Sequence, residues 1–272
     1  MEIREKLGLG KRFVIGMVHC LPLPGTVRYD GNRERIFAQA VQDAKTLEDA
    51  GVDAVIVENM GDDPFGVTLD TAQVAALAIA AVKVREAVGI PVGIDAAFCD
   101  YQASLSIAHT VGAEFVRIPV FVDTVEFYGG LIQPCARACM TYRKQLGAGD
   151  VMILADVQVK HTHMLLPHVS VEQSARNAAA CGADAIIVTG SAIGMETPIQ
   201  MIQRVKKAVS IPVIAGSGVN AANIREQLGI ADGAIIGSSL KEGGVLANPI
   251  SGALVREVLE GLGQSDAKGM KP

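Results

Sequence analysis

The segment DVQVKHTH (156–163) holds several of the side chains that catalyse acid–base or nucleophilic reactions. It follows an apolar stretch directly, so it marks the end of a buried strand. There are three alternatives for the function of this segment. It supplies a lysine that forms an imine, it binds a metal ion through two histidines, or it is merely the polar end of a strand. Because side chains alternate along a strand, Asp156, Gln158 and Lys160 are predicted to share the face toward a pocket. His161 is predicted to serve the loop or the outer side.

Other apolar runs also end in polar residues, namely His19, Glu58 with Asn59, and Asp95, while Arg117 lies within one. Burial raises the pKa of a carboxylate such as Glu58, which suits general acid–base catalysis or metal binding. An arginine in an apolar strand is costly unless it is paired. We therefore expect Arg117 to point inward, toward Asp95, Glu58 or an anionic ligand. The alternative for His19 and Glu58 is structural hydrogen bonding or ion pairing.

Two glycine- and serine-rich segments, GSGVN (216–220) and IGSSLKEGG (236–244), follow the last two apolar runs. Glycine lets the backbone approach an anion closely, and serine adds a donor, so the pair predicts a phosphate site. The alternative is that these loops only turn tightly. The residues expected to bind the substrate or its phosphate are Arg117, Asn59, Gln158, Thr189, Gly216, Ser217, Gly218, Gly237 and Ser238.

Short runs rich in valine and isoleucine recur along the whole chain, and most have apolar neighbours on both sides. Strands buried on both faces have this pattern, which is typical of a parallel sheet. The expected strands cover 13–19, 54–59, 91–97, 115–120, 151–159, 185–190, 212–218 and 233–240. The expected helices cover 33–50, 70–88, 102–111, 134–146, 171–181, 198–209, 221–228 and 249–262.

Eight alternations of strand and helix predict an α/β fold, a single (β/α)8 TIM barrel with a parallel, eight-stranded closed sheet. It is expected to span residues 1–272 as one domain, with a short lead (1–12) and a loose tail (about 263–272). An open doubly wound sheet would need a glycine-rich turn after the first strand, where the chain instead has HCLPLPG. In such barrels, catalytic residues lie at the carboxyl ends of the strands.

Composition narrows the function classes. The chain has 272 residues, half of them hydrophobic, and a formal net charge of −5, which does not favour nucleic acid as a partner. The charged N-terminus and the absence of a long apolar segment predict a cytoplasmic protein without membrane insertion. Five scattered cysteines suit a reducing compartment. Homo-oligomer formation is left open.

The motifs GMVHCLPLPG (16–25), VENMGDDPF (57–65) and ADVQVKH (155–161) resemble signatures of the BtpA family, which includes the SgcQ proteins. The resemblance extends along essentially the whole chain and implies a barrel related to the ribulose-phosphate-binding group. The family is associated with photosystem I accumulation in cyanobacteria, and other members resemble accessory genes of sugar-phosphotransferase uptake systems. The positions that match its motifs are His19, Glu58, Asn59, Asp156, Lys160 and His161.

Together these features predict an enzyme, an isomerase, epimerase or lyase, that moves protons next to a carbonyl group of a phosphorylated sugar or related metabolite. A divalent metal ion is an open cofactor. Class I aldolase-like imine formation on Lys160 is the alternative chemistry, although nearby acidic groups would raise the lysine pKa and disfavour it. A non-catalytic binding or assembly role on a degenerate barrel is the other alternative. The expected catalytic residues, His19, Glu58, Asp95, Asp156 and Lys160, include the four candidate metal ligands His19, Glu58, Asp95 and Asp156.

Overall fold

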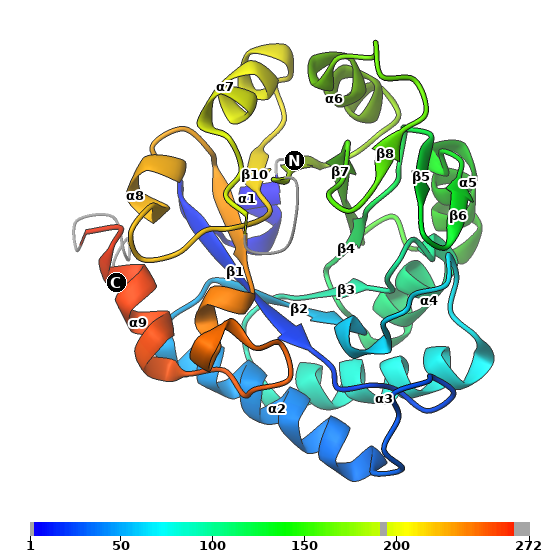
Figure 1. Cartoon of the computed structure of the whole chain (residues 1–272), viewed down its shortest axis with the longest axis vertical. Coiled ribbons are helices and arrows are strands. Elements are labelled where there is room, and N and C mark those ends of the chain that lie inside the picture. Colours follow the sequence, from blue (N-terminus) through cyan, green and yellow to red (C-terminus); the bar gives the residue numbers. More distant parts are fainter. Residues whose placement is uncertain (1–2, 191–194, 264–272) are drawn as a thin grey trace.

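The computed structural model describes residues 3–190 and 195–263. Within them, eight parallel strands close into a barrel in the order β1-β11-β10-β9-β7-β4-β3-β2 (Figure 1). The TIM-barrel fold predicted from the sequence is therefore confirmed. The strands are β1 (Phe13–His19), β2 (Ala54–Glu58), β3 (Val92–Asp95), β4 (Phe115–Ile118), β7 (Met152–Val157), β9 (Ala185–Val188), β10 (Val213–Ala215) and β11 (Gly233–Ile236).

Helices cover the outside of the barrel, as the alternating pattern predicted (Figure 1). The first, short helix is the exception: it was not predicted, it lies within the ring of strands in this view, and its Leu7 packs with the barrel interior. The helices are α1 (Ile3–Leu7), α2 (Arg33–Ala50), α3 (Thr71–Ala87), α4 (Tyr101–Val111), α5 (Ala136–Leu146), α6 (Val171–Ala180), α7 (Ile199–Ala208), α8 (Ile224–Gln227) and α9 (Gly252–Glu260). Short 3-10 helices are η1 (Met60–Asp62), η2 (Ser238–Leu240) and η3 (Glu242–Gly244). Almost all of the expected tail, and residues 191–194 of the loop after β9, lie outside the described residues.

Alternation along each strand sorts side chains into a barrel interior and an outer core. On β1, Phe13, Ile15 and Met17 belong to the interior cluster, whereas Val14 and Val18 pack against the helices. The next inward position on β1 is that of His19, at the carboxyl end of the strand. The same parity places the polar side chains of the neighbouring strands at the barrel mouth.

Glycine makes room for large rings inside the barrel. A Cβ atom on Gly93 of β3 would lie 2.2 Å from the Phe115 ring, and one on Gly233 of β11 would lie 2.3 Å from the Phe13 ring. The interior is therefore filled by large side chains set against glycine, as close packing requires. Among the described residues, the barrel interior is packed below the mouth, and the pocket described below lies at the mouth.

A small antiparallel sheet beside the barrel mouth was not predicted. Its strands β5 (Val125–Phe127), β6 (Gly130–Ile132) and β8 (His163–Met164) are arranged in the order β6-β5-β8. They have two or three residues each, too few for a repeating pattern to show in the sequence. The sheet joins the loop after β4 to the loop after β7, and it helps to wall the site.

Candidate functional site

The barrel mouth holds a pocket with a cavity volume of about 100 Å³. Parallel register places His19 of β1 beside Glu58 of β2, and Glu58 beside Asp95 of β3. Arg117 of β4 completes this row of polar side chains. The predicted site residues that line the pocket are His19, Glu58, Asp95, Arg117, Lys160, Gly216, Ser217, Gly218, Gly237 and Ser238.

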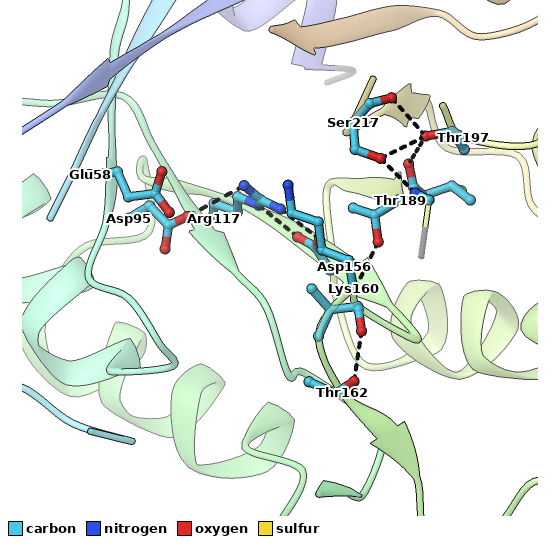
Figure 2. Close-up of polar contacts among 12 residues, drawn as sticks. Glu58, Asp95, Arg117, Asp156, Lys160, Thr162, Thr189, Thr197 and Ser217 are labelled. Atoms are coloured by element: carbon cyan, nitrogen blue, oxygen red, sulfur yellow. Dashed lines mark hydrogen bonds and ion pairs between the residues drawn. The ribbon is translucent and has the colours of Figure 1, made fainter. Parts of the chain in front are cut away.

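Arg117 is held by two carboxylates. Its Nε and one terminal nitrogen both donate to Asp156 at 2.8 Å, and its other terminal nitrogen lies 3.6 Å from Asp95 (Figure 2). The main partner is thus Asp156 of the adjacent strand β7, which was not among the partners expected from the sequence. Both oxygens of Asp156 accept hydrogen bonds from the guanidinium group, so this carboxylate orients Arg117.

Glu58 is an ionised carboxylate in a buried position. Its Oε2 lies 3.3 Å from Nε2 of His19. Burial alone would raise the pKa of Glu58, but the hydrogen bond to His19 and the charges of His19, Arg117 and Lys160 lower it below the usual value. This reverses the raised pKa expected from the sequence. A low pKa keeps Glu58 in the form that can accept a proton.

Asp95 lies next to Glu58, but its surroundings shift its pKa in the opposite direction. Burial, followed by the repulsion of Glu58, raises its pKa well above the usual range, and Arg117 offsets this only in part. Neither of its oxygens has a hydrogen-bond partner among the described residues, although the side chain is almost fully buried. A buried polar group without a partner is costly and calls for an explanation. A ligand bound in the pocket would supply the partner.

The two neighbouring carboxyl groups can therefore do different work. Proton transfer needs a base and a neutral acid side by side. Two neighbouring carboxyl groups whose pKa values are shifted in opposite directions are typical of such an acid–base pair. The open Nδ1 of His19, which has no hydrogen-bond partner among the described residues, adds another group that a ligand could contact.

Lys160 does reach the pocket, but not because of strand parity. Strand β7 ends at Val157, and the chain then turns through Gln158 (φ 48°) and His161 (φ 65°), both in the left-handed region. The Lys160 amide donates to Thr189 Oγ1 at 2.9 Å, and Lys160 lies beside Arg117 and Asp156 in Figure 2. Non-glycine residues in this conformation mark a loop whose path is imposed by its surroundings.

The Lys160 ammonium has no carboxylate within ion-pair distance, 4.0 Å, in the part of the chain that the structure describes. Burial and the charge of Arg117 lower its pKa, and the more distant Glu58, Asp156 and Asp95 only reduce this effect. The acidic neighbours do raise the lysine pKa, as expected from the sequence, but burial and Arg117 lower it more, so the expected net increase is wrong. Asp156 is already paired with Arg117, which explains why burial prevails.

Gln158 was predicted to face the pocket, and this is wrong. The side-chain amide of Gln158 donates to the carbonyl oxygen of Val169, and its backbone amide donates to Asp123. Asp123 also accepts from Ser174 of α6 at 2.6 Å. Gln158 and Asp123 thus anchor the loop that carries Lys160. Asp123 gave no signal in the sequence, because it follows β4 in a segment without a clear pattern.

Two more predicted binding residues have supporting positions. Asn59 is fully buried, and its side chain accepts from the amide of Ala97 and donates to the carbonyl oxygen of that residue. Asn59 therefore braces the loop after Asp95 and does not line the pocket. Thr189 is likewise engaged with the Lys160 amide. By contrast, His161, predicted to face away, does line the pocket.

The glycine- and serine-rich loops after β10 and β11 come together at one side of the pocket. Ser239 Oγ donates to the carbonyl oxygen of Val219 at 2.6 Å, which ties the two loops to each other. Ser217 Oγ accepts from the Gly190 amide at 2.6 Å and donates to Met195, and its backbone contacts Thr197 (Figure 2). The Ser217 hydroxyl is therefore already engaged in hydrogen bonds within the protein. The groups left to bind a ligand on this side are backbone amides and the Ser238 hydroxyl.

The four candidate metal ligands do not form a shared metal site. Within residues 3–190 and 195–263, no group of three histidine, cysteine, aspartate or glutamate side chains is close enough to hold one ion. Both oxygens of Asp156 are engaged by Arg117, and Glu58 is engaged by His19. The possible four-ligand set predicted from the sequence is wrong.

The family model of the BtpA family matches residues 10–263. The chain belongs to the BtpA family. An uncharacterized protein of Pyrococcus furiosus is 40% identical to this BtpA-family chain over 248 residues, covering 91% of the chain and 93% of the relative. The photosystem I biogenesis protein BtpA of Synechocystis is 36% identical over 261 residues, covering 95% and 89%.

Solved structures with the same fold are more distant from this family member. Tryptophan synthase of Mycobacterium tuberculosis aligns with a TM-score of 0.62 at 15% identity, covering 95% of this chain and 94% of the other. Thiamine phosphate pyrophosphorylase of Pyrococcus furiosus aligns with a TM-score of 0.57 at 16% identity, covering 96% and 98%. At this identity, the likeness shows the barrel fold alone. In the described residues, no helix combines the length and apolar character needed to cross a membrane.

Proposed function

We propose that this BtpA-family protein is an enzyme that transfers protons next to the carbonyl group of a phosphorylated sugar or related small metabolite, as an isomerase, epimerase or lyase. The observation that carries the proposal is the pair of adjacent carboxyl groups, Glu58 and Asp95, whose surroundings push their pKa values in opposite directions. A purely structural pair would have its oxygens satisfied, whereas those of Asp95 have no partner among the described residues.

The residues can be given roles in one balanced sequence. Glu58 removes the proton from the carbon beside the carbonyl group, and the electron pair moves to the carbonyl oxygen. Asp95 donates its proton to that oxygen, which gives a neutral enol, while the charges of Arg117 and Lys160 stabilise the developing negative charge. When the deprotonated carbon carries a hydroxyl group, Glu58 returns its proton to the former carbonyl carbon. That hydroxyl group then gives its proton to Asp95 and becomes the new carbonyl, which completes an isomerisation and restores both carboxyl groups. His19 holds Glu58 in place.

The phosphate group would bind where the loops after β10 and β11 meet. Gly216, Gly218 and Gly237 line this side of the pocket. The first amides of η2 have no acceptor within their own helix. Ser238 adds a hydroxyl group that lines the pocket. Oriented amides of this kind bind anions without any cationic side chain.

A thermal-shift titration tests the phosphate site directly. Ribose 5-phosphate is expected to raise the melting temperature, because a ligand that binds only the folded state stabilises it. Ser238→Asp should abolish the shift by placing a negative charge beside the phosphate, and Ser238→Asn, of matched size, should retain most of it. Equal shifts in the two variants would place the phosphate elsewhere.

Imine formation on Lys160 is the second candidate, and one observation favours it. The lysine is mostly buried, has a lowered pKa, and has no ion-pair partner within 4.0 Å among the described residues. A neutral amine is the form that attacks a carbonyl carbon. Its role as a fixed charge and its role as a nucleophile therefore need to be separated by experiment.

Borohydride trapping with mass spectrometry separates the two roles once a substrate is found. Proton transfer predicts no substrate adduct on Lys160 and predicts that Lys160→Arg retains part of the activity. Imine chemistry predicts a reduced adduct on Lys160 and no activity in Lys160→Arg, which keeps the charge but cannot form the imine. An adduct in the wild type would replace the first mechanism with the second.

A non-catalytic role is the remaining alternative, and it is favoured by the Synechocystis relative, which is named a photosystem I biogenesis protein. A binding protein would bind its ligand with Glu58 replaced by glutamine and would convert nothing. An enzyme would bind the ligand in both forms and convert it only with Glu58 present. Conversion is therefore the readout that decides between these functions.

A further inference from the structure

The pocket at the barrel mouth, which we call the reaction pocket, continues outward into a second, larger cavity. We call this second cavity the outer chamber. The two cavities share lining residues, so they are contiguous: His19, Met60, Phe65, Phe98, His161 and Leu246. The outer chamber has a volume of about 630 Å³. Its wall is built from the loops after β1, β2 and β3 and from the small sheet β6-β5-β8.

The two cavities differ in chemistry. The reaction pocket contains the side chains of Glu58, Asp95, Arg117 and Lys160. Among the described residues, the charged groups of the outer chamber other than its histidines are Arg28 and Asp63, which lie 2.7 Å apart and neutralise each other. The remaining wall is mainly apolar and aromatic. The outer chamber therefore suits an uncharged group.

Three rings form a continuous aromatic wall. Phe98 and Phe127 stack with their centres 4.6 Å apart and their planes 14° apart, and Phe127 contacts Tyr128 at 4.9 Å. The Tyr128 hydroxyl accepts from the Phe65 amide at 2.8 Å and donates to Asp63 at 3.2 Å. These bonds pin the turn between β5 and β6 to the loop after β2, so the wall is set before a ligand binds.

The size of the reaction pocket shows that this wall is needed. A water-sized group requires about 10–15 Å³ of cavity volume. The reaction pocket, with a volume of about 100 Å³, therefore holds on the order of ten such small groups. A phosphate and the reacting carbons fill that space. Any larger substituent has to extend into the outer chamber, where it meets the rings of Phe98 and Tyr128.

We propose that the outer chamber binds a planar aromatic or heteroaromatic ring that the phosphorylated substrate carries. The proposal rests on the proposed function and narrows it from phosphorylated metabolites in general to ring-bearing ones. Flat rings stack well on aromatic side chains, and such pairs contribute beyond the area that they bury. A flexible polar chain would gain nothing from this wall.

Calorimetric titration with matched probes tests the proposal. The pairs are ribose 5-phosphate against adenosine 5′-monophosphate and methyl phosphate against phenyl phosphate, which place a ring at two distances from the phosphate. The ring-bearing member of at least one pair is expected to bind at least tenfold more tightly. Tyr128→Ala, at a residue that lines the outer chamber and not the reaction pocket, should remove this gain and leave the ring-free affinity unchanged.

Leu131→Ala is the control, because Leu131 is exposed on the same hairpin and lines neither cavity. Equal affinities within both pairs would overturn the ring site while the phosphate site stands. Failure of every probe would overturn both proposals. If adenosine without phosphate binds as tightly as its monophosphate, and Tyr128→Ala weakens it, the ring site stands and the phosphate site falls.

Discussion

At the scale of single residues, the pKa values of the acidic side chains depend on which of them pairs with Arg117. Arg117 lies among three acidic side chains, but Asp156 takes both of its good hydrogen bonds. Asp95 is left with a longer contact of 3.6 Å, which only partly offsets the rise in its pKa caused by burial and by Glu58. The Arg117–Asp156 pair thus leaves Asp95 as the carboxyl group with the raised pKa, which is the acid of the proposed mechanism.

This arrangement predicts how stability depends on pH. Asp95 has a raised pKa, so the folded state holds a proton that the unfolded chain releases above about pH 4. Its stabilising contribution is therefore full at low pH and is lost as pH rises toward the folded-state pKa. Across that window the wild-type free energy of unfolding should fall, relative to Asp95→Asn, by up to about 1.4 kcal/mol per pH unit.

Urea unfolding of both proteins at several pH values between 5 and 8 checks this prediction. Because asparagine does not ionise, the difference between the two free energies should change steadily in favour of Asp95→Asn as pH rises. A difference that stays constant with pH would show that Asp95 is ionised in the folded protein. That result would remove the acid from the proposed mechanism.

At the scale of elements, the barrel strands position the first half of the site, and the loop after β7 positions the rest. Lys160 is placed by the hydrogen bond that its backbone amide donates to Thr189 and by the one that the backbone amide of Gln158 donates to Asp123. Asp123 accepts one bond with each oxygen, from the Gln158 amide and from the Ser174 hydroxyl. Its removal leaves both donors without these acceptors in a largely buried setting.

Asp123→Ala is therefore expected to lower the free energy of unfolding by about 1–3 kcal/mol. It should also weaken the binding of phosphorylated ligands, because the loop that carries Lys160 loses its anchor. Asp49→Ala, at an exposed position on α2, is the control and should change stability by less than about 0.5 kcal/mol. Normal stability and normal binding in Asp123→Ala would show that the anchor is unnecessary.

The same division explains what the sequence could predict. The ends of the apolar runs placed His19, Glu58 and Asp95 at the barrel mouth, and the cost of an unpaired charge in an apolar strand placed Arg117 there. Alternation along a strand held for Asp156, because a period of two holds as long as the strand lasts. Beyond Val157 it fails, and Gln158 turns away while His161 turns in. Loop geometry depends on contacts made across the fold, such as the one with Asp123, and these leave no local pattern.

At the scale of the whole molecule, charge gives little help in attracting an anion. The chain carries a net charge of −5. In the pocket, Arg117 and Lys160 balance Glu58 and Asp156 when Asp95 is protonated, which makes a formal sum of zero for these five groups. Affinity for phosphate must then come from short-range contacts with backbone amides, and the rest of the molecule repels the ligand weakly.

The net charge predicts in which direction the affinity for a phosphorylated ligand changes with salt concentration. Raising the salt concentration from 0.01 to 0.15 M shortens the screening length from about 30 to about 8 Å and weakens the long-range repulsion. The affinity for ribose 5-phosphate should stay the same or rise. Titration at the two salt concentrations measures it, and a several-fold loss of affinity at higher salt would indicate that cationic side chains dominate binding.

The central claim is that Glu58 acts as the base in a proton transfer beside a carbonyl group. Its most direct test is NMR detection of deuterium exchange from D₂O into a panel of phosphorylated carbonyl compounds, with ring-bearing members included. The wild type should catalyse exchange or conversion of at least one compound, and Glu58→Gln should reduce the rate by about 10²- to 10⁴-fold while still binding it. Exchange that persists in Glu58→Gln, or a panel that binds without any exchange in the wild type, would contradict the account.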